Sequence, residues 1–348
     1  MKLLTSIYLL ATAASAASVG LNKRESPLDI KLQMVSNTGV KATITNTGTS
    51  SLKVFKTGTF LDSAPVEKVK VYQGKSKVAF GGARLRVSTA HLEEEAFQTI
   101  AAGETVEADF DIGELHDLSI GGAFDIFSEG AMSYAVDNST KITGVVPFST
   151  NLMSAKIDGV EAAKVFSTFH MKRQEVQDDC TGTELSQTTN AINACAALAE
   201  EAASVAQSDD SKLEEYFKNT DSSTRSYVVD VFNKIASECG STTSGAAYYC
   251  SDVYGACSNG VLAYTLPSQD YMVNCPLFFS ALEPTSSVCH DQDQQTTALH
   301  ETTHLTEVAG TEDYNGYGYE FVQSLSAEQN LNHADTYTLF AQSIFANC

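Results

Sequence analysis

Short runs in which hydrophobic and polar residues alternate occupy the first half of the chain. The alternation is clear at residues 30–34, 40–44, 69–71 and 85–87, and Asn37-Thr38-Gly39 supplies a turn between the first two runs. A period of two places one side of a β-strand on a core and leaves the other side in water. We therefore expect this half to form an antiparallel, sandwich-like β module.

The second half has a longer, helical periodicity. Val228, Val231, Phe232 and Ile235 recur at the spacing of one helix face. Residues 248–280 differ, because their aromatic and β-branched residues and two prolines predict a small sheet. The predicted fold class is α+β, a β-rich segment followed by a mainly helical domain. The expected helices span residues 191–206 (with helical character continuing at 212–218), 224–238, 293–308, 319–329 and 335–346.

The amino terminus has the form of a secretory signal peptide. Met1-Lys2 gives a basic start, residues 3–14 are mostly apolar, and Ala14-Ser15-Ala16 has the small-x-small pattern that signal peptidase reads. The apolar run is too short for a permanent anchor, and no later segment is long and apolar enough to span a bilayer. We expect a secreted protein with a signal peptide at residues 1–16.

All eight cysteines lie in the second half of the chain, and the first of them is Cys180. An even number of cysteines in an exported chain predicts disulfides. No two cysteines have the C-x-x-C spacing that a cysteine zinc site would favour. We therefore expect up to four disulfides rather than a cysteine-bound metal.

Charge divides the chain at the same place. Residues 1–173 carry 18 basic and 18 acidic residues, whereas residues 174–348 carry 4 basic and 25 acidic residues and account for the whole net charge of −21. Lys172-Arg173 stands at this boundary and predicts a cut by a dibasic-cutting convertase. Lys23-Arg24 is either a minor second cut or ordinary surface charge. We expect a pro-segment at 17–173 and a mature catalytic domain at 174–348, one domain by its length.

The pentapeptide His300-Glu301-Thr302-Thr303-His304 carries the most specific chemistry in the chain. Residues four apart share a helix face, so both imidazoles can bind one zinc ion. Glu301 lies beside the first ligand, where it can take a proton from a zinc-bound water. This order of residues is the motif of a metallopeptidase.

A catalytic zinc site needs a third protein ligand and an open position for water. The motif helix is expected to stop at Gly310, after which the chain can fold back under the metal. Glu307 points at the wrong angle on a continuing helix, whereas Glu312 and Asp313 follow the turn. The residues alone leave four more distant candidates open: Glu320, Asp335, His290 and His333.

A second motif follows the first, and together the two resemble the deuterolysins, the aspzincin group of zinc endopeptidases. Gly310-Thr311-x-Asp313 with Tyr317-Gly318 is similar to the GTxDxxYG element of that family, although three residues rather than two separate Asp313 from Tyr317. The resemblance implies that Asp313 is the third zinc ligand, with Asp335 as the main alternative. It also implies that the Tyr317 hydroxyl stabilises the oxyanion, with Tyr314 and Tyr319 as the alternatives.

The resemblance covers the layout of the whole chain and implies a secreted zinc endopeptidase made as a zymogen that is cut after Arg173. One zinc ion per catalytic domain would be held by His300, His304 and Asp313, with Glu301 and Tyr317 as catalytic residues. Basic proteins such as histones and protamines would be favoured substrates. The implied disulfides are Cys180–Cys250, Cys257–Cys275 and Cys289–Cys348, with Cys195–Cys239 as an extra pair.

The strong acidity of the second half has two interpretations. It gives solubility in an acidic or salty exterior, or it attracts basic polypeptides toward the cleft. It argues against nucleic acids and anionic membranes as partners. We expect a monomer that acts on protein or peptide substrates. The rival hypotheses are a secreted, non-catalytic acidic binding protein and a different metal-dependent hydrolase with the same ligands.

The pro-segment has no cysteine, so it cannot silence a zinc ion through a thiolate. Steric blocking by the β module is the expected source of latency. His170, close to the predicted cut, is a candidate ligand from the pro-segment.

Overall fold

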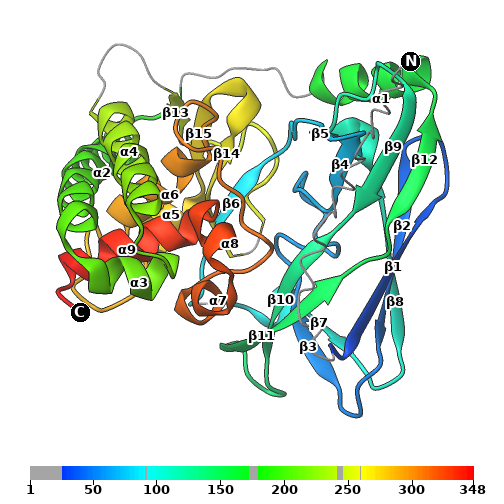
Figure 1. Ribbon diagram of the computed structural model, residues 1–348, viewed down its shortest axis with the longest axis horizontal. Helices are drawn as coiled ribbons and strands as arrows, with labels where there is room; N and C mark the ends of the chain where they lie inside the picture. Colours follow the sequence, from blue (N-terminus) through cyan, green and yellow to red (C-terminus); the bar gives the residue numbers. More distant parts are fainter. Residues whose placement is uncertain (1–25, 91, 172–178, 241–245, 259) are drawn as a thin grey trace, which may run out of the picture.

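The computed structural model describes residues 26–90, 92–171, 179–240, 246–258 and 260–348. Figure 1 shows two parts side by side, a strand-rich N-terminal part (residues 26–171) and a mainly helical C-terminal part (residues 179–348). Each part has a core of its own, within residues 28–162 and within residues 191–341, and a third cluster with residues from both parts joins them. The molecule is therefore a mixed α+β structure.

Three small sheets make up most of the N-terminal part, with strand orders β1-β2-β8, β11-β10-β3-β7 and β12-β9-β4-β5. The pairs within these sheets are antiparallel. The strands are β1 (Leu28–Met34), β2 (Gly39–Asn46), β3 (Leu52–Phe55), β4 (Lys70–Gln73), β5 (Ser76–Lys77), β7 (Phe97–Ile100), β8 (Thr105–Asp111), β9 (Gly122–Phe127), β10 (Glu129–Ala135), β11 (Ile142–Ser149) and β12 (Met153–Ile157). Helix α1 (Gly159–Met171) ends this part.

The alternation in the sequence explains how these strands pack. Ile30 and Leu32 on β1 are buried while Lys31 between them is exposed, and they pair with Ile44 and Ala42 on β2. All four side chains belong to one hydrophobic core, so the predicted strands at 30–34 and 40–44 are confirmed.

Strand β6 (Arg84–Val87) does not belong to the β module in which its sequence placed it. It pairs antiparallel with β14 of the C-terminal part and completes the sheet β13-β15-β14-β6. All four of its residues are buried. A period of two predicts a strand but not its partner, because pairing is decided by contacts that are distant in sequence. Figure 1 shows β6, in cyan, among the strands of the C-terminal part.

The C-terminal part contains the strands β13 (Ala247–Tyr249), β14 (Val261–Leu266) and β15 (Tyr271–Asn274), which form the predicted small sheet. Its helices are α2 (Gly182–Ser208), α3 (Asp210–Phe217), α4 (Ser222–Cys239), α5 (Pro276–Ala281), α6 (Gln294–His304), α7 (Tyr319–Ser324), α8 (Ala327–Leu331) and α9 (Ala334–Phe345). No helix among the described residues combines the length and the apolar character needed to cross a bilayer.

Small residues on α2 let this long helix lie close to its neighbours. Ala199, Ala202 and Ala206 are completely buried in the helical core, which also contains residues of α4, α6 and α9. Phe232 of α4 stacks on Phe340 of α9 at a centroid distance of 5.4 Å. Each fully buried aromatic ring contributes about 2–3 kcal/mol relative to an exposed one. This packing fixes α6, which carries the predicted metal motif, at the centre of the helical part.

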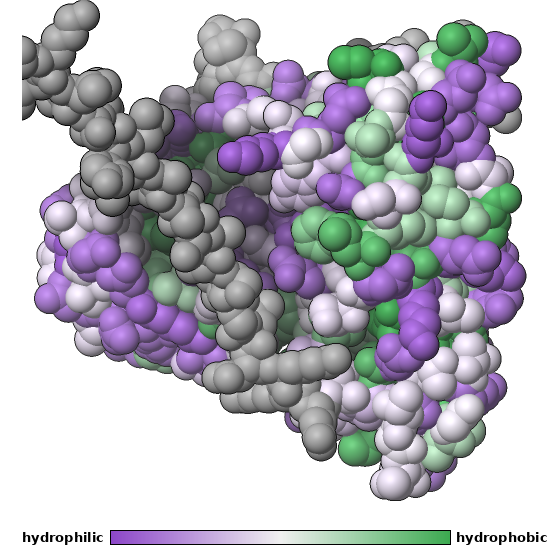
Figure 2. Space-filling view, turned by 45° about the vertical axis from the view of Figure 1, so that its right-hand side comes forward, coloured by the Kyte–Doolittle hydropathy of each residue, from purple (hydrophilic) through white to green (hydrophobic). Residues whose placement is uncertain are grey.

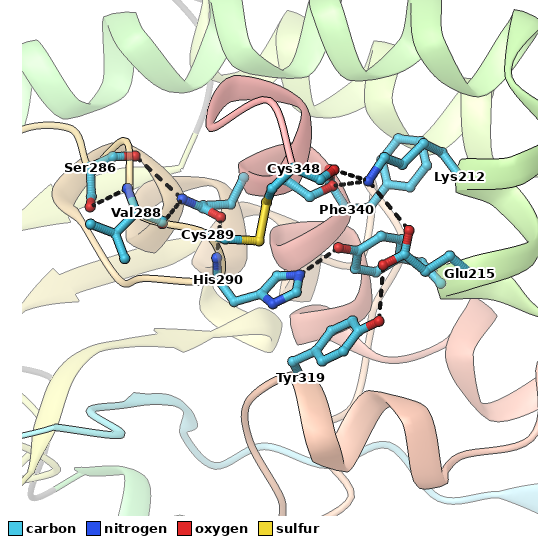
Figure 3. Close-up of a disulfide and its surroundings, with 12 residues drawn as sticks. Lys212, Glu215, Ser286, Val288, Cys289, His290, Tyr319, Phe340 and Cys348 are labelled. Carbon is cyan, nitrogen blue, oxygen red and sulfur yellow. Dashed lines mark hydrogen bonds and ion pairs between the residues drawn. A yellow bond between two sulfur atoms is a disulfide. The ribbon is translucent and has the colours of Figure 1, made fainter.

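Four disulfides join the eight cysteines: the three pairs implied by the family resemblance and the expected extra pair, Cys195–Cys239, between α2 and α4. Cys289–Cys348 ties the end of the chain to the segment before α6. Figure 3 shows this bridge with Lys212, which bonds the carbonyl of Cys348, and with His290, which lies between Tyr216 and Tyr319.

Candidate metal centre

Helix α6 presents the predicted motif from the interior of the protein. Asp293 caps the helix through a reciprocal capping box with Thr296, an interaction worth about 1 kcal/mol. All eleven residues of α6 are buried, although most of them are polar. His300 and His304 have no exposed surface. A helix built from polar residues and buried on every side needs hydrogen bonds or a ligand on its polar groups.

The helix ends at His304, earlier than the predicted end near Val308. Leu305 has φ −57° and ψ 136°, and its carbonyl accepts hydrogen bonds from the N–H groups of Val308, Ala309 and Gly310. Gly310 has a φ of 59°, a conformation that favours glycine. This turn reverses the chain and brings it back along α6.

After the turn, the chain is held against α6 by threonines. The N–H of Thr311 donates to the carbonyl of Thr303, and the two hydroxyl oxygens lie 2.7 Å apart. Asp313 therefore returns to the histidine face of the helix. Its Oδ1 lies 3.4 Å from Nε2 of His300 and 3.4 Å from Nε2 of His304.

These three ligand atoms have the spacing of a zinc site. The two Nε2 atoms are 3.2 Å apart. Two ligands at about 2.0–2.1 Å from an ion and at a tetrahedral angle are separated by about 3.3 Å, close to all three observed distances. Within the described residues, the buried Oδ1 of Asp313 has no hydrogen-bond partner, which also fits a metal ligand. The donor set of two imidazoles and a carboxylate suits zinc.

The other ring nitrogens of the two histidines contact the protein. Nδ1 of His304 lies 3.0 Å from the carbonyl oxygen of Thr311, and Nδ1 of His300 lies 3.1 Å from Oδ1 of Asp335. A proton on each Nδ1 leaves each Nε2 lone pair facing the centre. Burial, with Arg86 nearby, lowers the pKa of His300 to about 3, so its imidazole is neutral. Asp335 thus lies behind His300 rather than beside Asp313.

The remaining candidates from the sequence lie outside the group of His300, His304 and Asp313. His290 belongs to a second group with Cys289 and Cys348, but those two sulfurs are joined in a disulfide and are not thiolate ligands. Glu312 pairs with Lys77 and Lys70. Nε2 of His333 lies 3.3 Å from the carbonyl oxygen of Gly316, and Nε2 of His290 lies 2.6 Å from the hydroxyl oxygen of Tyr216. Glu307 and Glu320 are exposed.

Glu301 is buried next to this cluster. Its Oε2 accepts a hydrogen bond of 2.6 Å from the hydroxyl of Thr265 on β14, and its Oε1 has no partner among the described residues. Burial raises the pKa of Glu301 well above its usual value, and Thr265 only partly opposes this. Glu301 therefore binds a proton more readily than an ordinary glutamate does. Thr265 was missed in the sequence because no local motif marks it.

Tyr317 is the tyrosine whose surroundings include the site carboxylates. Burial raises its pKa well above 10, and the charges of Asp313, Asp62 and Glu301 add to the effect. Its hydroxyl packs against Gly58, where a Cβ would lie only 3.0 Å away. The hydroxyls of the alternatives are engaged elsewhere, that of Tyr314 with Asn332 and that of Tyr319 with Glu215.

Comparison with known proteins supports the same chemistry. The model of the deuterolysin metalloprotease (M35) family matches residues 1–348. The chain belongs to the deuterolysin family. It is 58% identical over its full length to a neutral protease 2 homolog of Colletotrichum graminicola, all of which is covered. It is 42% identical to neutral protease 2 of Aspergillus oryzae, with 99% of this chain and 98% of the relative covered.

A zinc peptidase from Grifola frondosa is similar in structure, with a TM-score of 0.40, 23% identity, and coverage of 47% of this chain and 98% of the other. Membership of the deuterolysin family makes this chain a zinc-dependent metalloendopeptidase. The His-His-Asp group described above is consistent with that metal.

The deuterolysin chain has an extra residue between Asp313 and Tyr317, and its backbone shows how the extra residue is accommodated. Tyr314 and Asn315 both have positive φ values, 50° and 60°. The N–H of Gly316 closes the turn on the carbonyl of Asp313 at 3.1 Å. The tight turn keeps both Asp313 and Tyr317 buried.

Proposed function

We propose that this chain is the precursor of a secreted zinc endopeptidase in which His300, His304 and Asp313 hold the metal. The observation that carries the proposal is the set of three mutual distances, 3.2, 3.4 and 3.4 Å, between their ligand atoms. A bound zinc ion supplies charge that polarises the scissile carbonyl and lowers the pKa of the attacking water.

Glu301 is the proposed general base. Its carboxyl group takes a proton from the attacking water and passes it to the leaving amine, which requires a pKa nearer to neutrality than that of an ordinary glutamate. The raised pKa that burial gives Glu301 supports this role. Thr265 orients the carboxyl through its 2.6 Å hydrogen bond. Tyr317, protonated at any working pH, donates to the developing oxyanion.

We further propose that the chain is a zymogen with a signal peptide at 1–16, a pro-segment at 17–173 and a mature part at 174–348. Support comes from the signal pattern and from the step in charge at Lys172-Arg173. Residues 1–25 and 172–178, which hold both predicted cuts, lie outside the described residues, as does the side chain of His170. A dibasic-cutting convertase is the proposed partner in maturation.

A preference for basic proteins such as protamines is proposed from the charge. The 25 acidic residues of the second half attract cationic polypeptides, and the proposed mature part retains the whole net charge of −21.

The experiment uses the full chain before and after cutting by a dibasic-specific convertase. The cut protein should hydrolyse casein, lose this activity on removal of zinc by a chelator, and regain it when zinc is added back. Glu301→Gln should bind zinc as the parent does and lose at least about 1,000-fold in kcat, because the proton-transfer group is gone. Substantial activity in this variant would remove Glu301 from its role, and a cut protein that is inactive with bound zinc would overturn the proposed function.

A further inference from the structure

Strand β6 lies along the C-terminal part as an added edge strand, next to the metal-binding residues. It runs antiparallel to β14, with Arg84 opposite Thr265 and Leu85 opposite Tyr264. Within the sheet, β14 would be the edge strand if β6 were absent. An exposed edge beside a catalytic centre offers backbone groups to an extended peptide, a common mode of peptide recognition.

The peptide bond between Leu85 and Arg86 lies at the proposed catalytic residues. The carbonyl oxygen of Leu85 is 3.3 Å from Nε2 of His300, and the N–H of Leu85 donates to Oδ2 of Asp313 at 3.3 Å. On the other side of this bond, the backbone N–H of Arg86 is close enough to Glu301 to lower the pKa of that carboxyl. The carbonyl thus faces the ligands and the N–H faces the proposed base, the arrangement of a bond about to be cleaved.

The side chain of Arg86 holds the strand in place. The guanidinium group is 1% exposed, pairs with the carboxylate of Asp335 and lies 3.2 Å from Nδ1 of His300. Its buried Nε has no hydrogen-bond partner among the described residues. A buried cation with an unsatisfied donor is costly for folding alone, which favours a role in binding over one in stability.

Residues 87–89, which follow Arg86, also form backbone hydrogen bonds with the C-terminal part. The side chain of Gln292 donates to the carbonyl of Val87 at 2.8 Å and accepts from the N–H of Thr89 at 2.8 Å. The N–H of Ser88 donates to the carbonyl of Gly260 at 2.7 Å. The segment is thus bound along its length, as an extended substrate would be.

The other end of β6 is anchored in the N-terminal part. Arg84 pairs with Glu67 at 2.5 Å, and Lys70 and Lys77 reach across to Glu312. Figure 2 shows the surface hollowed between the two parts, with hydrophilic residues along it. The N-terminal half of the chain therefore supplies two cations, Lys70 and Lys77, to Glu312 of the C-terminal part.

We propose that β6 is a built-in, substrate-like inhibitor, with the Leu85–Arg86 peptide in the position of the scissile bond. The proposal rests on the zymogen function proposed above. Latency is enforced by the addition of β6 to β14 rather than by a ligand from His170. The proposal also assigns the β14 edge as the surface on which an extended substrate binds after β6 has left.

The test uses the uncut full chain loaded with zinc and compares the parent with Arg86→Ala. Lys53→Ala is the matched control, because Lys53 is also a buried cation, 3% exposed, but pairs with Glu94 within the N-terminal part. The first measurement is the rate at which a chromophoric chelator removes zinc, and the second is casein hydrolysis. Loss of one partner of a buried charge pair typically weakens binding about 100-fold.

We expect Arg86→Ala to release zinc at least about tenfold faster than the parent and to hydrolyse casein without being cut, while Lys53→Ala behaves like the parent. Equal zinc release and equal latency in all three proteins would overturn the inference. If Arg86→Ala fails to fold, amide hydrogen exchange of the parent decides: the amides of β14 should exchange faster once the N-terminal part has been cut and removed. Unchanged exchange in β14 would overturn the inference.

The two proposals fail in different ways. A cut parent that binds zinc but does not hydrolyse casein contradicts the peptidase function. A cut parent that is active, beside an uncut parent that is equally active, contradicts only the inhibitory role of β6.

Discussion

At the scale of single residues, each proposed histidine ligand uses one ring nitrogen for the metal and the other for the protein. Thr311 contacts His304, and Asp335 contacts His300. The motif residues could be predicted from their spacing because the helix itself brings them together. Thr265 and Arg86 could not, because they lie 36 and 214 positions from the motif residues that they contact.

The two aspartates can be told apart by their zinc affinity. Asp313→Asn should lower zinc affinity by more than about 100-fold, because a charged ligand is lost, whereas Asp335→Asn should lower it by about 10–100-fold, because only the support of His300 weakens. Competition with a fluorescent chelator measures both affinities. If Asp335→Asn had the larger effect and Asp313→Asn bound zinc normally, Asp335 would be the ligand.

Tyr317→Phe should reduce kcat by about 100–1,000-fold with little change in KM, because a donor to the oxyanion acts only in the transition state. Tyr314→Phe is the control from the same loop, since its hydroxyl bonds Asn332 instead. Steady-state kinetics of the cut protein decide between them. A larger loss for Tyr314→Phe would transfer the role to Tyr314.

At the scale of helices and strands, the sequence predicted where elements form better than where they end or what they pair with. Asp293 starts α6 where the sequence predicts a helix, but the helix ends at the buried Leu305, before its predicted stop at Gly310. The expected helix at 319–329 is two helices, α7 and α8, because Ser326 caps a new one through its own capping box. β6 pairs with β14 of the C-terminal part rather than within the predicted β module, because its partner is far away in sequence.

The N-terminal part contains a buried histidine that links its stability to pH. His116 is 2% exposed, packs on Phe80, and its Nδ1 lies 3.2 Å from the carbonyl of Ala79. Burial lowers its pKa from 6.5 to about 4, with Lys77 and Arg84 adding to this effect and Glu67 opposing it. Below about pH 6.5 the unfolded state binds a proton on His116, whereas the folded state keeps the ring neutral. The folding stability is therefore at its full value above pH 6.5.

This stability is lost as the pH falls from about 6.5 toward 4, and the loss amounts to about 3 kcal/mol. His116→Phe should therefore show a smaller drop in unfolding free energy between pH 7 and pH 4 than the parent. Urea unfolding of both proteins, each carrying Glu301→Gln to prevent self-digestion, gives the comparison. An equal drop in both would mean that His116 is not the group that titrates.

At the scale of the whole molecule, charge is distributed between the two parts according to their proposed roles. The first 173 residues carry no net charge, and the remainder carries −21. The uneven distribution was visible in the sequence, whereas the way in which Lys70 and Lys77 meet Glu312 was visible only in the structure.

Salt should slow the cleavage of a basic substrate by the cut protein. Raising the salt concentration from 50 mM to 500 mM shortens the range of electrostatic attraction to about 4 Å, so kcat/KM for protamine should fall by about tenfold or more. An uncharged peptide serves as the control and should change by less than about twofold. If protamine were cleaved equally fast at both salt concentrations, electrostatic attraction would not explain the preference.

The pairing of β6 with β14 has a further consequence for the mature protein proposed above. Departure of β6 leaves a bare sheet edge, and such edges allow identical molecules to join into aggregates. The same departure removes every residue of the neutral half, so each released molecule carries the full negative charge. Mutual repulsion between these molecules then opposes their self-association and keeps the bare edge free for extended peptides.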